Sequence, residues 1–259
     1  ITALTVQNIG IVETYSIGFK DSLDIINSAK VAKYLNTNHT SVIVTEKEML
    51  DAIEETIKQI ESYDVTTIRA SVPMFLLSKY ISKNSNSKVI LSGEGADETS
   101  GSYLYFHNAP NPDEFKQETF RLIQDNRFFD ILRADKTTAG AGLELRVPFY
   151  DKSFVNYYMS VDPKLKIPRN GYEKYLLRKT FQDMLPDEIV WRRKDGFSDG
   201  VSTLEKPWYQ TINDYTVEKF RMKEKDYYDY VFNKYYGQHR NTIPYRWIPK
   251  WCEETENPS

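Results

Sequence analysis

An acidic loop that follows a short apolar run is the first place where this chain could do chemistry. Residues 89–91 carry no polar side chain to mark a solvent face, which predicts a short buried strand. Gly93 and Gly95 lack a Cβ, so the backbone after the strand can turn sharply and approach a ligand closely. The same loop holds Glu94, Asp97 and a third carboxylate, and such a cluster is stabilised by a cation or a basic partner. The alternative is a surface turn rich in glycine and acid.

Two threonines and an arginine at residues 66–69 form a second candidate, at the expected start of a helix. Backbone N–H groups there, with the hydroxyls of Thr66 and Thr67 and the guanidinium of Arg69, would make a receptor for a carboxylate. The alternative is a capped helix that carries one exposed arginine.

Residues 133–151 place charges beside small residues, where the chain and a ligand can approach each other closely. The four charges considered are those of Arg133, Asp135, Arg146 and Asp151. The alternative is a set of buried structural ion pairs, and for Arg146 and Asp151 this structural interpretation is favoured.

Three consecutive cations, Arg192, Arg193 and Lys194, precede a glycine-containing loop within residues 191–200. Such a segment could cover phosphate groups, with one lysine acting as a mobile point charge. A solvated basic turn is the alternative, and the charge pattern alone favours it.

The secondary structure expected to position these residues differs between the two parts of the chain. Strand patterns at 11–18, 41–44 and 89–91 alternate with helical patterns, including one that begins at a capping box of Thr45 and Glu48. This alternation predicts an α/β fold with parallel pairing and right-handed crossovers. Strand patterns vanish after residue 101, and helices are expected at 115–130, 154–160, 172–185 and 226–235. We therefore expect an α/β nucleotide-binding part over 1–100 and a mainly helical part over 101–259.

Composition excludes several classes of function. The net charge of −3 provides no broad basic field, so nucleic acid is not an expected partner. No apolar run approaches the ~20 residues of a membrane span, so no membrane association is expected. The single cysteine, Cys252, excludes an internal disulfide and is typical of a reducing compartment, which predicts a cytoplasmic protein.

Taken together and in order, the candidate segments resemble the synthetase domain of the glutamine-hydrolysing asparagine synthetases. The stretches that carry this resemblance are residues 15–18, 61–71, 91–98, 103–110, 132–151, 191–200 and 247–251. The resemblance implies a Rossmann-like parallel sheet of the adenine nucleotide α-hydrolase type. It also implies an ATP-dependent conversion of aspartate to asparagine through β-aspartyl-AMP, releasing AMP and pyrophosphate.

The resemblance also implies roles for individual residues, with ATP and Mg²⁺ as the cofactors. Catalytic roles fall to Glu94, which is associated with forming and consuming the adenylate, and to Lys194, which stabilises the α-phosphate and the departing pyrophosphate. The implied ligand contacts are Ile17, Ser92 and Gly93 for ATP, Thr66, Thr67 and Arg69 for aspartate, and Asp97 for Mg²⁺.

The sequence departs from the family in two respects. The family's Ser-Gly-Gly-x-Asp-Ser pyrophosphate loop and its glutaminase domain do not occur in these 259 residues. We therefore expect a longer protein, ammonia supplied by a glutaminase domain outside this chain, and no complete reaction by the chain alone. The sequence does not decide whether the protein forms a homodimer. Two other functions stay open as well: a β-lactam-forming synthetase that uses the same adenylation domain, and a non-catalytic binding or scaffold protein derived from a synthetase.

Overall fold

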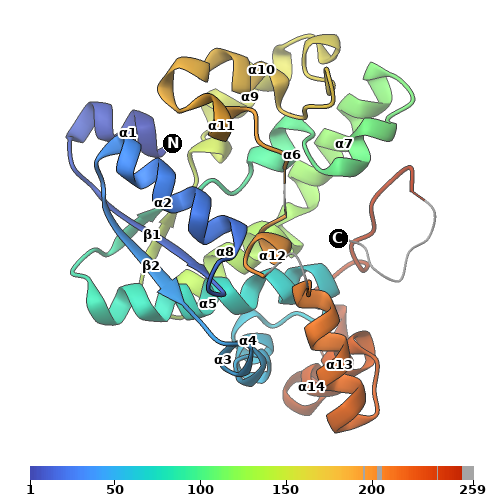
Figure 1. The fold of residues 1–259 in the computed structure, drawn as a ribbon. Helices are drawn as coiled ribbons and strands as arrows, with labels where there is room; N and C mark the ends of the chain where they lie inside the picture. The colour runs from blue at the N-terminus through green and yellow to red at the C-terminus, as the bar shows by residue number, and fades with distance from the viewer. Residues whose placement is uncertain (195, 203–205, 238, 253–259) are drawn as a thin grey trace.

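The fold is mixed α/β, with two short parallel strand pairs embedded among helices (Figure 1). The computed structural model describes residues 1–194, 196–202, 206–237 and 239–252. Strand β1 (Glu13–Gly18) pairs with β2 (Asn38–Ile43), and β3 (Val89–Leu91) pairs with β4 (Glu144–Arg146). The expected parallel pairing is thus confirmed, although the two pairs form separate sheets among the described residues.

The strand–helix alternation of the first hundred residues is confirmed. Helix α1 (Thr2–Ile9) precedes β1, and α2 (Leu23–Leu35) connects β1 to β2. The capping box of Thr45 and Glu48 begins α3 (Glu46–Asp51), because each side chain bonds to the backbone N–H of the other. Helices α4 (Ile53–Ile60) and α5 (Val65–Asn84) then lead to β3.

The rest of the described chain is mainly helical, as expected, with one exception. Its helices are α6 (Ala96–Ser100), α7 (Pro112–Asp125), α8 (Asp130–Ala139), α9 (Lys152–Ser160), α10 (Tyr175–Thr180), α11 (Asp187–Val190), α12 (Phe197–Gly200), α13 (Trp208–Phe220) and α14 (Glu224–Tyr236). The exception is β4, whose two exposed positions are the charged residues Glu144 and Arg146, so that no apolar run marks it as a strand.

One buried cluster joins the two parts of the chain. The apolar stripe of α4 packs with Trp208 of α13 and with Tyr228 and Phe232 of α14. Figure 1 shows α13 and α14 beside α3 and α4, at the end of the molecule opposite α9, α10 and α11. A division at residue 100 remains a prediction, since residues on both sides of it share this core. None of the helices in the described part is both long and apolar enough to cross a membrane.

Candidate active site

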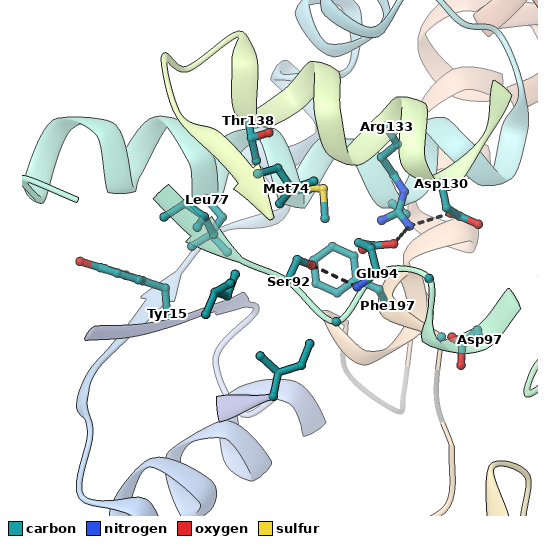
Figure 2. A pocket seen from close by; sticks show the side chains of 18 of the residues that line it. Tyr15, Met74, Leu77, Ser92, Glu94, Asp97, Asp130, Arg133, Thr138 and Phe197 are labelled. Atoms are coloured by element: carbon teal, nitrogen blue, oxygen red, sulfur yellow. Dashed lines mark hydrogen bonds and ion pairs between the residues drawn. The ribbon is translucent and has the colours of Figure 1, made fainter. Parts of the chain in front are cut away.

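A cavity of about 990 Å³ opens between the two strand pairs and receives the acidic loop. This volume is at the upper end of the ~300–1,000 Å³ typical of small-molecule sites. The cavity has an apolar arm, lined by Ile9, Tyr15, Met74, Leu77 and Leu91, and a polar arm, lined by Ser92, Glu94, Asp97, Asp130, Arg133 and Lys194. In Figure 2, Tyr15 and Leu77 lie across the cavity from Glu94 and Arg133.

The expectation that residues 89–91 form a buried strand is wrong. Val89 is 52% exposed and Leu91 is 46% exposed. Among the residues that the structure describes, strand β3 pairs only with β4, and its residues line the apolar arm of the cavity. An apolar strand is buried only when other strands and helices pack against it. The residues of β3 face the cavity instead of such neighbours.

Gly95 shapes the acidic loop that follows β3. Its φ of +87° lies in the left-handed region, and a Cβ built there would lie 2.2 Å from the ring of Tyr150. A glycine is therefore required at position 95 for two reasons: the left-handed backbone conformation and the close packing of the Tyr150 ring against it. A Cβ on Gly93 would meet nothing within 4 Å, which leaves open space above the backbone where the nucleotide contact was predicted. Both Ser92 and Gly93 line the cavity.

Glu94 and Arg133 form an ion pair within the polar arm. Arg133 donates from Nη2 to Glu94 Oε2 at 2.9 Å and to Asp130 Oδ1 at 2.6 Å (Figure 2). Burial raises the pKa of Glu94 to about 7, although the positive charge of Arg133 opposes the shift. A carboxyl group that titrates near neutral pH can both take up and give back a proton.

Two neighbouring carboxyls, those of Glu98 and Asp130, share the hydroxyl of Tyr103. Its oxygen lies 2.6 Å from Glu98 Oε1 and 2.8 Å from Asp130 Oδ2. One hydroxyl carries one proton, so it can donate to only one of these two carboxyls. Burial, followed by the charge of Asp130, raises the pKa of Glu98 well above its usual value. Burial and the neighbouring charge of Asp130 thus favour the protonated form of Glu98.

Asp97 has two lysine partners instead of a buried arginine. Lys174 Nζ donates to Oδ1 at 2.6 Å, and Lys194 Nζ lies 3.6 Å from Oδ2. Burial alone would raise the pKa of Asp97, but the charges of Lys174 and Lys194 hold it well below its usual range. Asp97 is thus an ionised carboxylate on the cavity wall. Across the described residues, no group of three or more His, Cys, Asp or Glu side chains could hold a metal by itself.

Arg69 is paired with Glu224 in this structure, and the expectation that it receives aspartate stays a prediction. Its Nε and Nη2 donate to the two carboxylate oxygens of Glu224 at 2.8 and 2.6 Å. Both side chains are buried, with exposures of 4% and 7%, and Arg69 does not line the cavity. The hydroxyl of Tyr228 also donates to Glu224, at 2.9 Å. The exposed-arginine alternative is wrong, since the pair is enclosed.

The other predicted ligand contacts divide between cavity and core. Thr66 lines the cavity, but its hydroxyl donates to Asp64, as does that of Thr67. Asp64 thereby caps the start of α5. The two threonine hydroxyls, which were expected to bind a ligand's carboxylate, donate to the carboxylate of Asp64 instead. The side chain of Ile17 is enclosed in the core and 1% exposed, so it does not face the cavity.

The expectation that Arg146 and Asp151 form buried structural ion pairs is also wrong, since both residues are exposed. Arg146 pairs with exposed Glu144, and Asp151 accepts backbone N–H groups at the start of α9. Asp135 is exposed and lies outside the cavity lining. In the basic segment, Lys194 reaches the cavity, whereas Asp195 lies outside the described residues.

Two residues of the site were missed. Asp130 precedes Arg133 by one helical turn on α8, a spacing that could have predicted a pair. Lys174 is separated from Asp97 by 77 positions, and no local pattern connects them.

Comparison with known proteins identifies the class to which this fold and site belong. A model of the asparagine synthase family matches residues 1–121 and 108–254, so the chain belongs to that family. It is 44% identical over 263 aligned positions to the asparagine synthetase [glutamine-hydrolyzing] of Gallus gallus, and 43% identical to that of Homo sapiens. Each alignment covers 94% of this chain and 47% of the relative, so the chain spans about half the length of the curated relatives it matches.

Proposed function

We propose that this chain provides the adenylating site of an asparagine synthetase. The reaction is the ATP-dependent conversion of aspartate to asparagine, with nitrogen from glutamine-derived ammonia in the full-length protein. The observation that carries the proposal is the acidic loop, which presents Glu94 against Arg133 and Asp97 against Lys194 on the wall of one cavity. Family membership and the names of the relatives support it.

In the first step, an oxygen of aspartate's side-chain carboxylate would attack the α-phosphorus of ATP, and the bond to pyrophosphate would break. Positive charge is needed where negative charge develops on the phosphates. Lys194 would supply it, because its Nζ already lies beside Asp97 in the polar arm. Ser92 and Gly93 would contact the nucleotide in the adenine nucleotide α-hydrolase manner, with the ligand beyond the carboxyl end of β3.

Asp97 would be the protein ligand of Mg²⁺. Mg²⁺ commonly binds through one or two carboxylates together with substrate phosphates, and a single ionised aspartate fits that role. Bound there, the ion would neutralise phosphate charge. The adenine contact of Ile17 remains a prediction. So does the reception of aspartate by Thr66, Thr67 and Arg69, for which Arg69 would first have to leave Glu224.

In the second step, ammonia would attack the acyl carbon of β-aspartyl-AMP, and the bond from that carbon to the AMP oxygen would break. The attacking nitrogen must lose a proton to reach the neutral amide. Glu94 would accept it, because the pKa of its buried carboxyl is raised to about 7 and its ionised form is held by Arg133.

The test is aspartate-dependent release of pyrophosphate from ATP and Mg²⁺ by the full-length protein, with asparagine measured as the product. We expect aspartate to support release far better than a bulkier carboxylate substrate of a β-lactam-forming synthetase. Preference for the bulkier acid would indicate that alternative enzyme. Failure to bind ATP with Mg²⁺ in calorimetry would indicate a non-catalytic protein.

A further inference from the structure

Tyr103 lines the cavity and contacts charged residues with two different parts of its side chain. Its hydroxyl oxygen lies 2.8 Å from Asp130 Oδ2, and Lys194 Nζ lies 5.1 Å from the centre of its ring. A lysine ammonium within about 6 Å of a ring centre is attracted to the face of the ring. The ring and the hydroxyl of Tyr103 therefore have separate partners in the polar arm.

The hydroxyl is connected to Glu94 through two charged side chains. Asp130 Oδ2 faces Tyr103, and Asp130 Oδ1 accepts from Arg133 Nη2 at 2.6 Å. The same nitrogen of Arg133 donates to Glu94 Oε2 at 2.9 Å (Figure 2). Burial opposes the ionisation of Asp130, but the charge of Arg133 and several hydrogen bonds, among them that of Tyr103, hold its pKa below the usual value. The hydroxyl thus stabilises the charged form of the residue with which Glu94 shares Arg133.

The ring of Tyr103 is held by two other aromatic side chains. It stacks on Tyr105, with centres 6.1 Å apart and planes 9° from parallel, and its centre lies 5.6 Å from that of Trp247. Tyr105 is itself buried. Packing of this kind limits the rotation of the ring, so that its face and its hydroxyl keep fixed directions.

We propose that Tyr103 is a positioning residue for both steps of the reaction: its ring holds Lys194 for the first step, and its hydroxyl holds Glu94 for the second, through Asp130 and Arg133. The inference rests on the proposed function, which assigns the two steps to Lys194 and Glu94. It adds a residue that acts through others, with a different part of one side chain serving each step.

The test is a single turnover of the full-length protein with ATP, Mg²⁺, aspartate and ammonium chloride, in which pyrophosphate and asparagine are both measured after rapid quenching. Tyr103→Phe keeps the ring and removes the hydroxyl. We expect pyrophosphate to form at nearly the wild-type rate and asparagine to form about tenfold more slowly, because a hydrogen bond to a charged group is lost. A tyrosine that only filled space would be replaced by phenylalanine without this division.

Tyr103→Leu removes the ring as well as the hydroxyl. Pyrophosphate formation should then also slow, by about fivefold, because Lys194 loses the aromatic face. The conservative variant Tyr103→Phe therefore rescues the first step and not the second. If circular dichroism shows that Tyr103→Leu is unfolded, Tyr103→Met takes its place with the same expected result.

A double-mutant cycle tests the route from the hydroxyl to Glu94. Asp130→Asn should slow asparagine formation as Tyr103→Phe does, and the double variant should lose no more than the larger single loss, because both changes interrupt one connection. Independent, additive losses would overturn this route. Tyr157→Phe and Tyr157→Leu alter a tyrosine of α9 that is 73% exposed, and neither should change either product.

The wild type separates this inference from the proposed function. A wild-type protein that releases no pyrophosphate with aspartate would overturn the proposed function, and the inference with it. With an active wild type, two results would overturn the inference alone. One is a Tyr103→Phe variant that slows both products equally or slows neither. The other is a folded Tyr103→Leu variant that forms pyrophosphate as fast as Tyr103→Phe does.

Discussion

Two arginine–glutamate pairs in this molecule look alike in chemistry and differ in surroundings. Arg69 and Glu224 are joined by two hydrogen bonds and enclosed, with the hydroxyl of Tyr228 on the carboxylate. Arg133 bonds to Glu94 from one nitrogen only, and within the described part of the chain its Nε and Nη1 have no hydrogen-bond partner. The Arg69–Glu224 pair is enclosed by protein. The Arg133–Glu94 pair lines the cavity, and two nitrogens of Arg133 lack a hydrogen-bond partner among the described residues.

The sequence alone did not predict this difference. The motif at residues 66–69 was expected to bind a ligand, and in the structure Arg69 forms an ion pair with Glu224. The segment that contains Arg133 had a structural interpretation as its alternative, yet it contacts the acid at the proposed reaction centre. The two arginines are about equally buried, and what separates them is that Arg133 lines the cavity whereas Arg69 does not.

Removal of Arg69 should have the largest effect on stability. Arg69→Ala leaves Glu224 buried without its cation, which is expected to cost about 3–5 kcal/mol of unfolding free energy. Urea denaturation of the chain measures this, with the exposed Arg146→Ala as a matched control that should change little. If Arg69→Ala instead kept wild-type stability and weakened aspartate binding more than ATP binding in the full-length protein, Arg69 would belong to the ligand site.

Removal of Glu94 should affect the reaction and leave the fold intact. In the full-length protein, Glu94→Ala should lower asparagine formation by about 100-fold or more, because the proton acceptor of the second step is lost. Product analysis gives the rate, thermal unfolding checks the fold, and Asp135→Ala provides an exposed-acid control. A near-normal yield of asparagine would remove Glu94 from the mechanism.

The raised pKa of Glu94 predicts a pH dependence of stability. The folded state binds the proton more tightly than the unfolded state, in which the pKa is near 4.5, so ionisation above that pH favours unfolding. This contribution is complete below about pH 4.5 and is lost as the pH rises to about 7. The slope is at most ~1.4 kcal/mol per pH unit. Unfolding free energies of the wild type minus those of Glu94→Gln should fall across this range; a flat difference would contradict the shift.

The smallest effect on the free energy of unfolding is expected for Tyr228, which contacts the Arg69–Glu224 pair through its hydroxyl. Tyr228→Phe removes one hydrogen bond to Glu224 while both bonds from Arg69 remain, and should cost about 1 kcal/mol. Denaturant titration measures the loss. A cost as large as that of Arg69→Ala would mean that the hydroxyl, and not the guanidinium, is the main partner of Glu224.

Local sequence determined much of the scaffold. The alternation of the first hundred residues predicted parallel pairing, and the capping box of Thr45 and Glu48 began a helix as expected. The loop of residues 92–98 was found from its glycines and carboxylates, and six of its residues line the cavity: Ser92, Gly93, Glu94, Gly95, Asp97 and Glu98. These features depend on neighbours within a few positions, where backbone conformation and side-chain period are encoded directly.

Tertiary structure alone decided which charges meet. Arg69 finds Glu224 across 155 positions, and Lys174 finds Asp97 across 77. The sequence supplies the charged groups, but a charge's partner and its desolvation are set by how distant helices pack. The exposure of β3 was decided in the same way, because an apolar strand is buried only if other elements pack against it.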